Sequence, residues 1–274
     1  MTWVDRNQQL IGRLRAYVDC FAEIKPSFFQ YFLGGTSHVF PYKTDSEEGF
    51  KTLLLYSALQ QELHEDWLNR LLVTVYRAFP EKFFSLASIP YDSLKALLDT
   101  IPDLSNWRFY SRTPGILRSV CDFFLKQGNI KPLLLNADST EQVVSIISNE
   151  IFYMGKTSVF KTKARTYLWY CANASADISR NCWNKHSLLP VTAGANRLMY
   201  YLGPLKSRKG YSFQEQEKIN YFNRFYNYLF PDNSWKSHLP FMAFQNQTGL
   251  TGYQCQSLLD GCKNCPLCND CGFE

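Results

Sequence analysis

The sequence predicts an all-α protein with two helical lobes. Apolar residues recur at helical spacing along most of the 274-residue chain. No alternating apolar and polar run is bounded by the Asn-Gly or Asp-Gly turns that mark β-hairpins. The composition is 46% apolar, 16% aromatic and 19% charged, which provides for a substantial core and argues against disorder.

Capping residues mark where individual helices begin. Thr113 and Pro114 place a capping residue before a proline, and proline is favoured at the first position of a helix. Asp138 followed by Glu141 is a capping pattern ahead of the helically spaced valines and isoleucines of residues 143–151. The helices predicted in chain order are 50–63, 66–79, 115–126, the stretch 138–151, and 212–230.

Basic residues are concentrated in one part of the chain. The net charge is only +5, yet residues 156–209 contain ten Lys and Arg against one acidic residue, Asp177. The rest of the chain has 19 basic and 23 acidic residues. Such a block indicates a surface that binds a polyanion, although an ordinary solvated face has the same composition. The ten residues are Lys156, Lys161, Lys163, Arg165, Arg180, Lys185, Arg197, Lys206, Arg208 and Lys209.

Signals for a membrane segment or for export are missing from the sequence. No apolar run approaches the roughly 18–20 residues of a membrane span. The N-terminus becomes charged at Asp5 and Arg6, before an apolar export segment can form. We therefore expect an intracellular protein that does not engage a membrane and whose cysteines are reduced.

Cysteines are concentrated at the end of the chain. Four of the nine form the pattern Cys255-x6-Cys262-x2-Cys265-x5-Cys271, with Cys268 inside the last gap. Thiolates this close together reach one centre when the chain wraps around a metal or cluster. Three kinds of site are open. They are disulfides, a structural zinc site and an iron–sulfur cluster. The reducing interior of a cell disfavours disulfides. Structural zinc normally takes one pair of ligands from each of two separate turns, whereas these cysteines are all close together in the sequence. The other cysteines fit small buried apolar positions: Cys20, Cys121, Cys171 and Cys182.

The cysteine spacing resembles the [4Fe–4S] loop that ends the endonuclease III and adenine DNA glycosylase branch of the helix-hairpin-helix glycosylase superfamily. Further segments of the chain resemble family elements in the same order, so the resemblance covers roughly residues 50–274. It implies a [4Fe–4S] cofactor of mainly structural, redox-linked role, with Cys268 outside the ligand set. The implied ligands are Cys255, Cys262, Cys265 and Cys271. The further segments are Leu59-Gln60-Gln61, then 79–88, 107–112, 154–166 and 189–198.

The resemblance also implies a domain organisation and a partner. Residues 46–166 are expected to form a six-helix barrel lobe that ends in the hairpin. Residues 1–45 and 167–274 are expected to form the cluster lobe, with the cluster loop at 255–271. The partner is double-stranded DNA, bound by a monomer. The residues expected to contact DNA are Gln60, Gln61, Lys156, Lys161, Lys163, Arg165 and Arg197.

The family extrudes a base from the duplex and breaks its N-glycosidic bond, and here the sequence departs from the family pattern. Thr192 stands where the family has its catalytic aspartate, and Thr162 stands where some members have a catalytic lysine. Lys163 and Asp177 are the candidates to replace them, so the candidate catalytic residues are Asp177, Thr192 and Lys163. The expected function is recognition of damaged, mismatched or modified bases. Two forms of it are open: a monofunctional DNA glycosylase of base excision repair with an atypical active site, or a non-catalytic iron–sulfur DNA-binding module.

Overall fold

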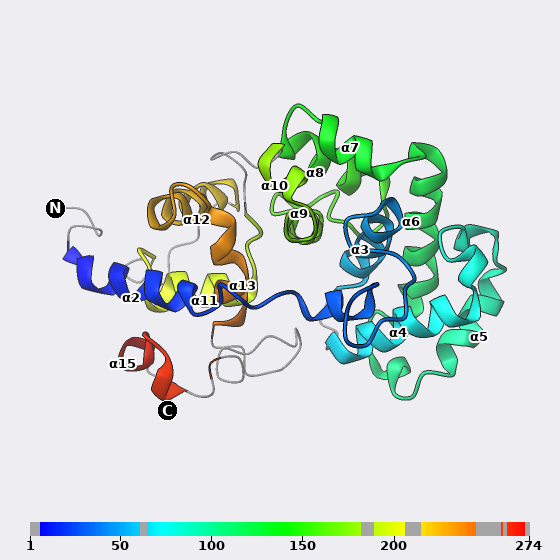
Figure 1. Cartoon of the computed structure of the whole chain (residues 1–274), viewed down its shortest axis with the longest axis horizontal. Coiled ribbons are helices and arrows are strands. Elements are labelled where there is room, and N and C mark those ends of the chain that lie inside the picture. The colour runs from blue at the N-terminus through cyan, green and yellow to red at the C-terminus, as the bar shows by residue number, and fades with distance from the viewer. Residues whose placement is uncertain are drawn as a thin grey trace. The chain divides into compact units, whose positions relative to one another are not determined.

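The computed structural model describes residues 6–60, 65–181, 189–205, 215–244, 259 and 262–271 (Figure 1). Within these residues the chain forms α-helices, short 3-10 helices and loops, and no strand, so the predicted all-α class is confirmed. None of the described helices combines the length and the apolar character that crossing a membrane requires. The chain divides into two compact units, Lys25–Ser187 and a second made of Met1–Ile24 with Leu188–Glu274.

The unit Lys25–Ser187 is built around helix α3. Apart from Lys51, the residues of this helix from Gly49 to Leu59 are buried, as expected for a helix surrounded by others. It packs mainly against α9 and α6 (Figure 1). The α-helices are α3 (Glu47–Leu59), α4 (Glu65–Ala78), α5 (Tyr91–Asp99), α6 (Thr113–Gln127), α7 (Ile130–Asn136), α8 (Thr140–Glu150), α9 (Thr162–Ala174) and α10 (Ala176–Asn181). The 3-10 helices are η1 (Ser27–Tyr31), η2 (Pro80–Lys82), η3 (Leu86–Ser88), η4 (Leu104–Asn106) and η5 (Tyr110–Arg112).

The boundaries of this unit differ from the predicted 46–166 at both ends. Residues 25–45 belong to it because their aromatic side chains enter its core: Phe28 stacks on Tyr56 of α3 with ring centroids 4.0 Å apart. Phe40 packs against Phe83 in the same cluster, at 5.8 Å. At the other end, α9 continues to Ala174 as a single helix, so no boundary falls at residue 166.

The cap of α8 lies one residue later than the sequence pattern suggests. Ser139 is the N-cap, and its hydroxyl accepts a hydrogen bond from the backbone N–H of Gln142 at 3.2 Å. The side chain of Gln142 accepts in return from the backbone N–H of Asp138 at 2.8 Å. Glu141 is thereby released from capping and binds Arg165 of α9.

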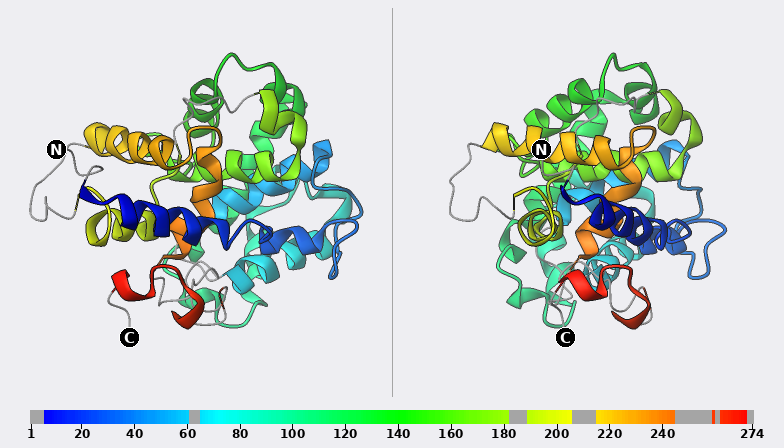
Figure 2. Two further views of the ribbon diagram at one scale, coloured as in Figure 1. Left: turned by 60° about the vertical axis from the view of Figure 1, so that its left-hand side comes forward. Right: turned by 90° about the vertical axis from the view of Figure 1, so that its left-hand side faces the viewer.

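The second unit joins the N-terminal helix to the C-terminal part of the chain. Tyr17 of α2 donates a hydrogen bond to the carbonyl of Pro240 at 2.8 Å, and α2 contacts both α12 and α13 (Figure 2). Gly194 lets α11 approach α13 closely, because a Cβ there would lie 2.2 Å from the carbonyl oxygen of Met242. The elements are α2 (Gln8–Asp19), α11 (Ala193–Tyr201), α12 (Glu215–Leu229), η7 (Ser234–Ser237), α13 (His238–Ala243), η8 (Cys262–Asn264) and α15 (Cys268–Cys271).

Candidate functional site

A hairpin loop of residues 151–161 connects α8 to α9. Three of its residues have left-handed backbone conformations: Tyr153 (φ 65°), Gly155 (φ 93°) and Lys161 (φ 42°). The loop is tied to α6, because the backbone N–H of Phe152 donates to the hydroxyl of Ser119 at 2.9 Å. These turns leave an open pocket of about 730 Å³ between the loop and the first turn of α9.

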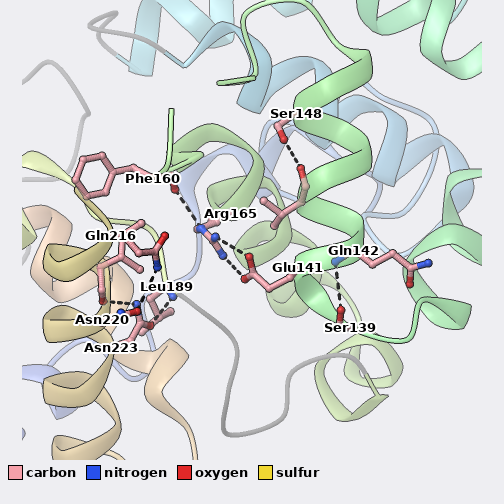
Figure 3. A network of polar contacts seen from close by, with 12 residues as sticks. Ser139, Glu141, Gln142, Ser148, Phe160, Arg165, Leu189, Gln216, Asn220 and Asn223 are labelled. Carbon is pink, nitrogen blue, oxygen red and sulfur yellow. Dashed lines mark hydrogen bonds and ion pairs between the residues drawn. The ribbon is translucent and has the colours of Figure 1, made fainter. Parts of the chain in front are cut away.

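Arg165 holds this hairpin from the inside. Its side chain is only 3% exposed, and its Nη2 lies 2.8 Å from Oε2 of Glu141 in a two-point ion pair (Figure 3). Its Nε donates to the carbonyl of Phe160 at 3.1 Å, at the end of the loop (Figure 3). The sequence places Arg165 among the DNA contacts. The geometry instead gives its guanidinium an internal role, because it is buried and its donors serve the hairpin.

Lys163 also makes an internal contact, although it lines the pocket. Its Nζ donates to the carbonyl of Ala58, near the end of α3, at 2.7 Å. Burial lowers the pKa of Lys163 from its ordinary value to about 8. Part of the amine is therefore neutral near that pH and can accept a proton.

Lys156 and Lys161 lie at the hairpin, Lys156 exposed and Lys161 half-buried as the N-cap of α9. The acidic residue of the pocket, Glu150, faces Lys126 at 2.7 Å, and this hydrogen bond lowers the pKa of its carboxyl. The first turn of α9 contains no acidic residue. Helix N-termini attract anions, so the N-terminal end of α9 and these lysines both favour the binding of an anion at the hairpin.

Two arginines beside the hairpin were not predicted as DNA contacts. Arg112 is exposed and lies over the ring of Tyr153 in the hairpin loop, 5.0 Å from its centroid. Arg108, also exposed, lies 4.5 Å over the ring of Phe109, and Arg112 lies 5.5 Å from the centroid of the same ring. The signal in the sequence is the alternation of Arg and aromatic residues in 107–112. A guanidinium stacked on a ring, as Arg112 is on Tyr153, can still present its edge to a phosphate.

Gln60 ends α3 close to the Lys163 contact. Its backbone N–H bonds to the carbonyls of Tyr56 and Ser57, and its amide oxygen accepts from the hydroxyl of Tyr170 at 3.5 Å. Gln61 lies outside the described residues.

The remaining candidate residues belong to separate places. Asp177 is exposed on α10, within Lys25–Ser187. Thr192 lies in the other unit as the N-cap of α11, where its hydroxyl accepts from the backbone N–H of Ala195 at 3.2 Å. Arg197, in the same helix, donates to the carbonyl of Phe244 at 3.4 Å. The hydroxyl of Thr192 therefore has a capping role, which an aspartate performs equally well.

The cysteine loop is described in part. Cys265, Cys268 and Cys271 are half-buried, while Cys255 and the side chain of Cys262 lie outside the described part. The thiols present are suitable soft ligands for iron. Across the described residues, no group of three or more His, Cys, Asp and Glu side chains is arranged to hold a metal ion.

The loop is anchored to the N-terminal helix. Asp270, next to Cys271, forms a two-point ion pair with Arg13 of α2, with N–O distances of 2.6 and 2.8 Å. This contact raises the pKa of the Arg13 guanidinium. Leu267, a residue of the loop itself, is fully buried. Comparison of the chain with protein-family models, with curated proteins and with solved structures finds no match.

Proposed function

We propose that this protein binds double-stranded DNA through the hairpin between α8 and α9 and the two arginines beside it. The observation that carries the proposal is the contact between Arg112 and Tyr153. It joins the exposed arginines of 108–112 to the hairpin, so that four cations lie on or beside this loop. They are Arg108, Arg112, Lys156 and Lys161.

The arrangement suits phosphate more than a protein partner. Cations on a rigid loop neutralise phosphates and release counterions, and most of the affinity for a duplex comes from this term. The aromatic rings of Phe109 and Tyr153 hold the guanidiniums by cation–π contacts of about 0.5–1 kcal/mol each. The pair of the buried Arg165 with Glu141 keeps the loop in place without using the charges of Arg112 and Lys156.

The proposal is tested by fluorescence anisotropy with a labelled duplex. A variant with Arg112→Gln, Lys156→Gln and Lys161→Asn is expected to lose at least about tenfold in affinity at low salt. Asparagine is chosen at position 161 because it tolerates the left-handed backbone there. The control is Lys82→Gln, an exposed lysine of η2. Equal affinity of the triple variant and the control would refute the proposal.

Base excision is a second candidate function, favoured by the pocket position and lowered pKa of Lys163. A partly neutral amine can take a proton from a water molecule that attacks the sugar. The alternative is a binding module without catalysis, favoured by the capping role of Thr192. Release of a base from a damaged duplex, lost on Lys163→Met while duplex binding is retained, would establish excision.

A [4Fe–4S] cluster completes the proposed function. Cys255, Cys262, Cys265 and Cys271 would hold it, and when bound it would cross-link the C-terminal loop through iron–thiolate bonds. The ion pair of Arg13 with Asp270 would hold the loop against α2.

A further inference from the structure

A second pocket lies within Lys25–Ser187, away from the hairpin loop. It has a volume of about 530 Å³ and is lined by residues 25–27, 29–30 and 32–36 together with Thr44. Its walls include the rings of Phe29 and Phe32 and the polar side chains of Ser27 and Gln30. Polar and apolar groups contribute about equally to its lining, and small-molecule sites combine apolar walls with polar groups that fix the ligand.

A buried carboxylate stands behind this pocket. Glu65, the first residue of α4, is only 6% exposed. Its Oε1 accepts hydrogen bonds from the hydroxyls of Ser27 and of Tyr56, the second at 3.1 Å. Buried carboxylates require such donors. Because Ser27 gives its proton to Glu65, its oxygen can act toward the pocket only as an acceptor.

Gln30 provides a hydrogen-bond donor to the pocket, where Ser27 provides an acceptor. Its amide oxygen accepts from the hydroxyl of Ser37 at 3.4 Å, so the NH2 group is the part of the amide that can donate to a bound molecule. The half-buried ring of Phe29 provides a flat apolar wall. Acceptor, donor and ring together match the edge and the face of a nucleobase.

The pocket wall is connected to the end of α3, where Gln60 lies. Phe29 contacts Tyr170 with ring centroids 6.4 Å apart, and Tyr170 donates to the amide of Gln60. Tyr56, which binds Glu65, packs edge-on against the same Tyr170 at 5.5 Å. One network of contacts therefore joins the pocket to this end of α3.

We propose that the pocket of residues 25–44 binds a single nucleobase, with Phe29 stacked on its face, Ser27 and Gln30 on its edge, and Glu65 as a positioning residue for Ser27. This inference rests on the proposed function, since in that setting the base is one extruded from bound DNA. It deepens that function by assigning the place where the base is read.

The first test uses adenosine. Because adenosine has no phosphate, its binding reports on the pocket without a contribution from the cations of the hairpin. Ligand-observed NMR should show saturation transfer to the base protons of adenosine with the wild-type protein. Phe29→Ala and Gln30→Ala should each weaken binding about tenfold, as expected when a stacking ring or an edge donor is removed. Phe29→Leu keeps much of the side-chain volume but removes the aromatic face, so it should weaken adenosine binding as Phe29→Ala does. Leu125→Ala, at an exposed position of α6, is the control.

Variants of Ser27 test the hydroxyl that Glu65 positions. Ser27→Ala should weaken adenosine binding, whereas Ser27→Thr retains a hydroxyl for Glu65 and should restore it. The second test uses a duplex with 2-aminopurine in a mismatch, whose fluorescence rises on unstacking. The wild-type protein should raise the 2-aminopurine fluorescence, and Phe29→Ala should not. Phe29→Ala should bind the matched duplex as tightly as the wild type does.

The outcomes distinguish the two proposals. Adenosine binding that is absent, or that is equal in wild type and Phe29→Ala, overturns the nucleobase pocket. Adenosine binding that depends on Phe29 and Gln30, in a protein with no affinity for any duplex, supports the pocket and overturns the DNA-binding proposal instead.

Discussion

The hairpin and the cysteine loop are both candidate binding elements, but they are held in place differently. The hairpin is fixed by contacts of side chains that reach into the protein, chiefly the buried Arg165 with the more exposed Glu141, and Lys163 with the carbonyl of Ala58. The described cysteine loop has one fully buried side chain, Leu267, and an ion pair whose Arg13 is exposed. Exposed ion pairs add little to stability. The hairpin is therefore preorganised by the chain itself, whereas we expect the cysteine loop to depend on its ligand.

The largest effect should come from removing a cysteine ligand. Cys262→Ser should abolish iron binding and the visible absorption of the cluster, and should make the C-terminal loop sensitive to protease, because iron–thiolate bonds replace a core there. Iron and sulfide analysis of anaerobically prepared protein provides the measurement. Cys268→Ser is the matched control and should keep about four iron atoms per chain. Stoichiometric zinc without iron in the wild type would contradict this prediction.

A smaller effect is expected at the hairpin support. Arg165→Met should lower the free energy of unfolding by about 1–3 kcal/mol, because the Phe160 carbonyl loses its donor and Glu141 loses its buried partner. Urea unfolding measures the change. Lys126→Met breaks the exposed pair with Glu150 and should cost less than about 1 kcal/mol. If both variants are destabilised equally, Arg165 does not support the hairpin as described.

Lys163 makes stability depend on pH. Its pKa is lowered to about 8 in the folded chain, so the unfolded chain binds more protons between about pH 8 and 10.5. The cost of burying the charge is fully present below pH 8 and is relieved as the pH rises. Relative to Lys163→Met, the free energy of unfolding of the wild type should rise by about 1–3 kcal/mol across this pH range. Urea unfolding of both proteins at pH 7.5 and 10 tests this, and a constant difference would exclude the shifted lysine.

The smallest effect is expected at Thr192. Thr192→Ala removes the cap of α11 and should cost about 1 kcal/mol, while Thr192→Asp should retain most of the stability. Thermal unfolding of the two variants gives the comparison. A loss of base excision in Thr192→Ala far beyond its loss of folded protein would assign this hydroxyl to catalysis instead.

Periodicity and caps were sufficient to predict the helical class and most of α3, α4, α6, α8 and α12. The start of α3 was missed because Ser46 caps the helix by bonding the backbone N–H of Gly49, before the apolar pattern begins. From the sequence, residues 25–45 are expected in the cluster lobe, whereas the structure places them in the unit Lys25–Ser187. Their place depends on the stack of Phe28 on Tyr56, a contact distant in sequence that local patterns do not report.

The roles of individual charges were less predictable. In sequence, Lys156, Lys163 and Arg165 are equivalent members of one basic block. What separates them is the partner that the fold supplies: Ala58 for Lys163 and Glu141 for Arg165. Such partners are fixed by helix packing, which a charge count does not contain. Arg108 and Arg112 lie outside the block, and the contact of Arg112 with the ring of Tyr153 connects their segment to the hairpin.

The salt dependence of duplex binding tests the central claim most directly. For wild type and for a variant with Arg108→Gln, Arg112→Gln and Lys156→Gln, log Kd is measured against log salt concentration. The account predicts a slope flatter by about three in the variant, since each cation removed leaves one phosphate without its neutralising partner and lowers the slope by about one unit. An unchanged slope, or a wild type that does not bind duplex at low salt, would contradict it.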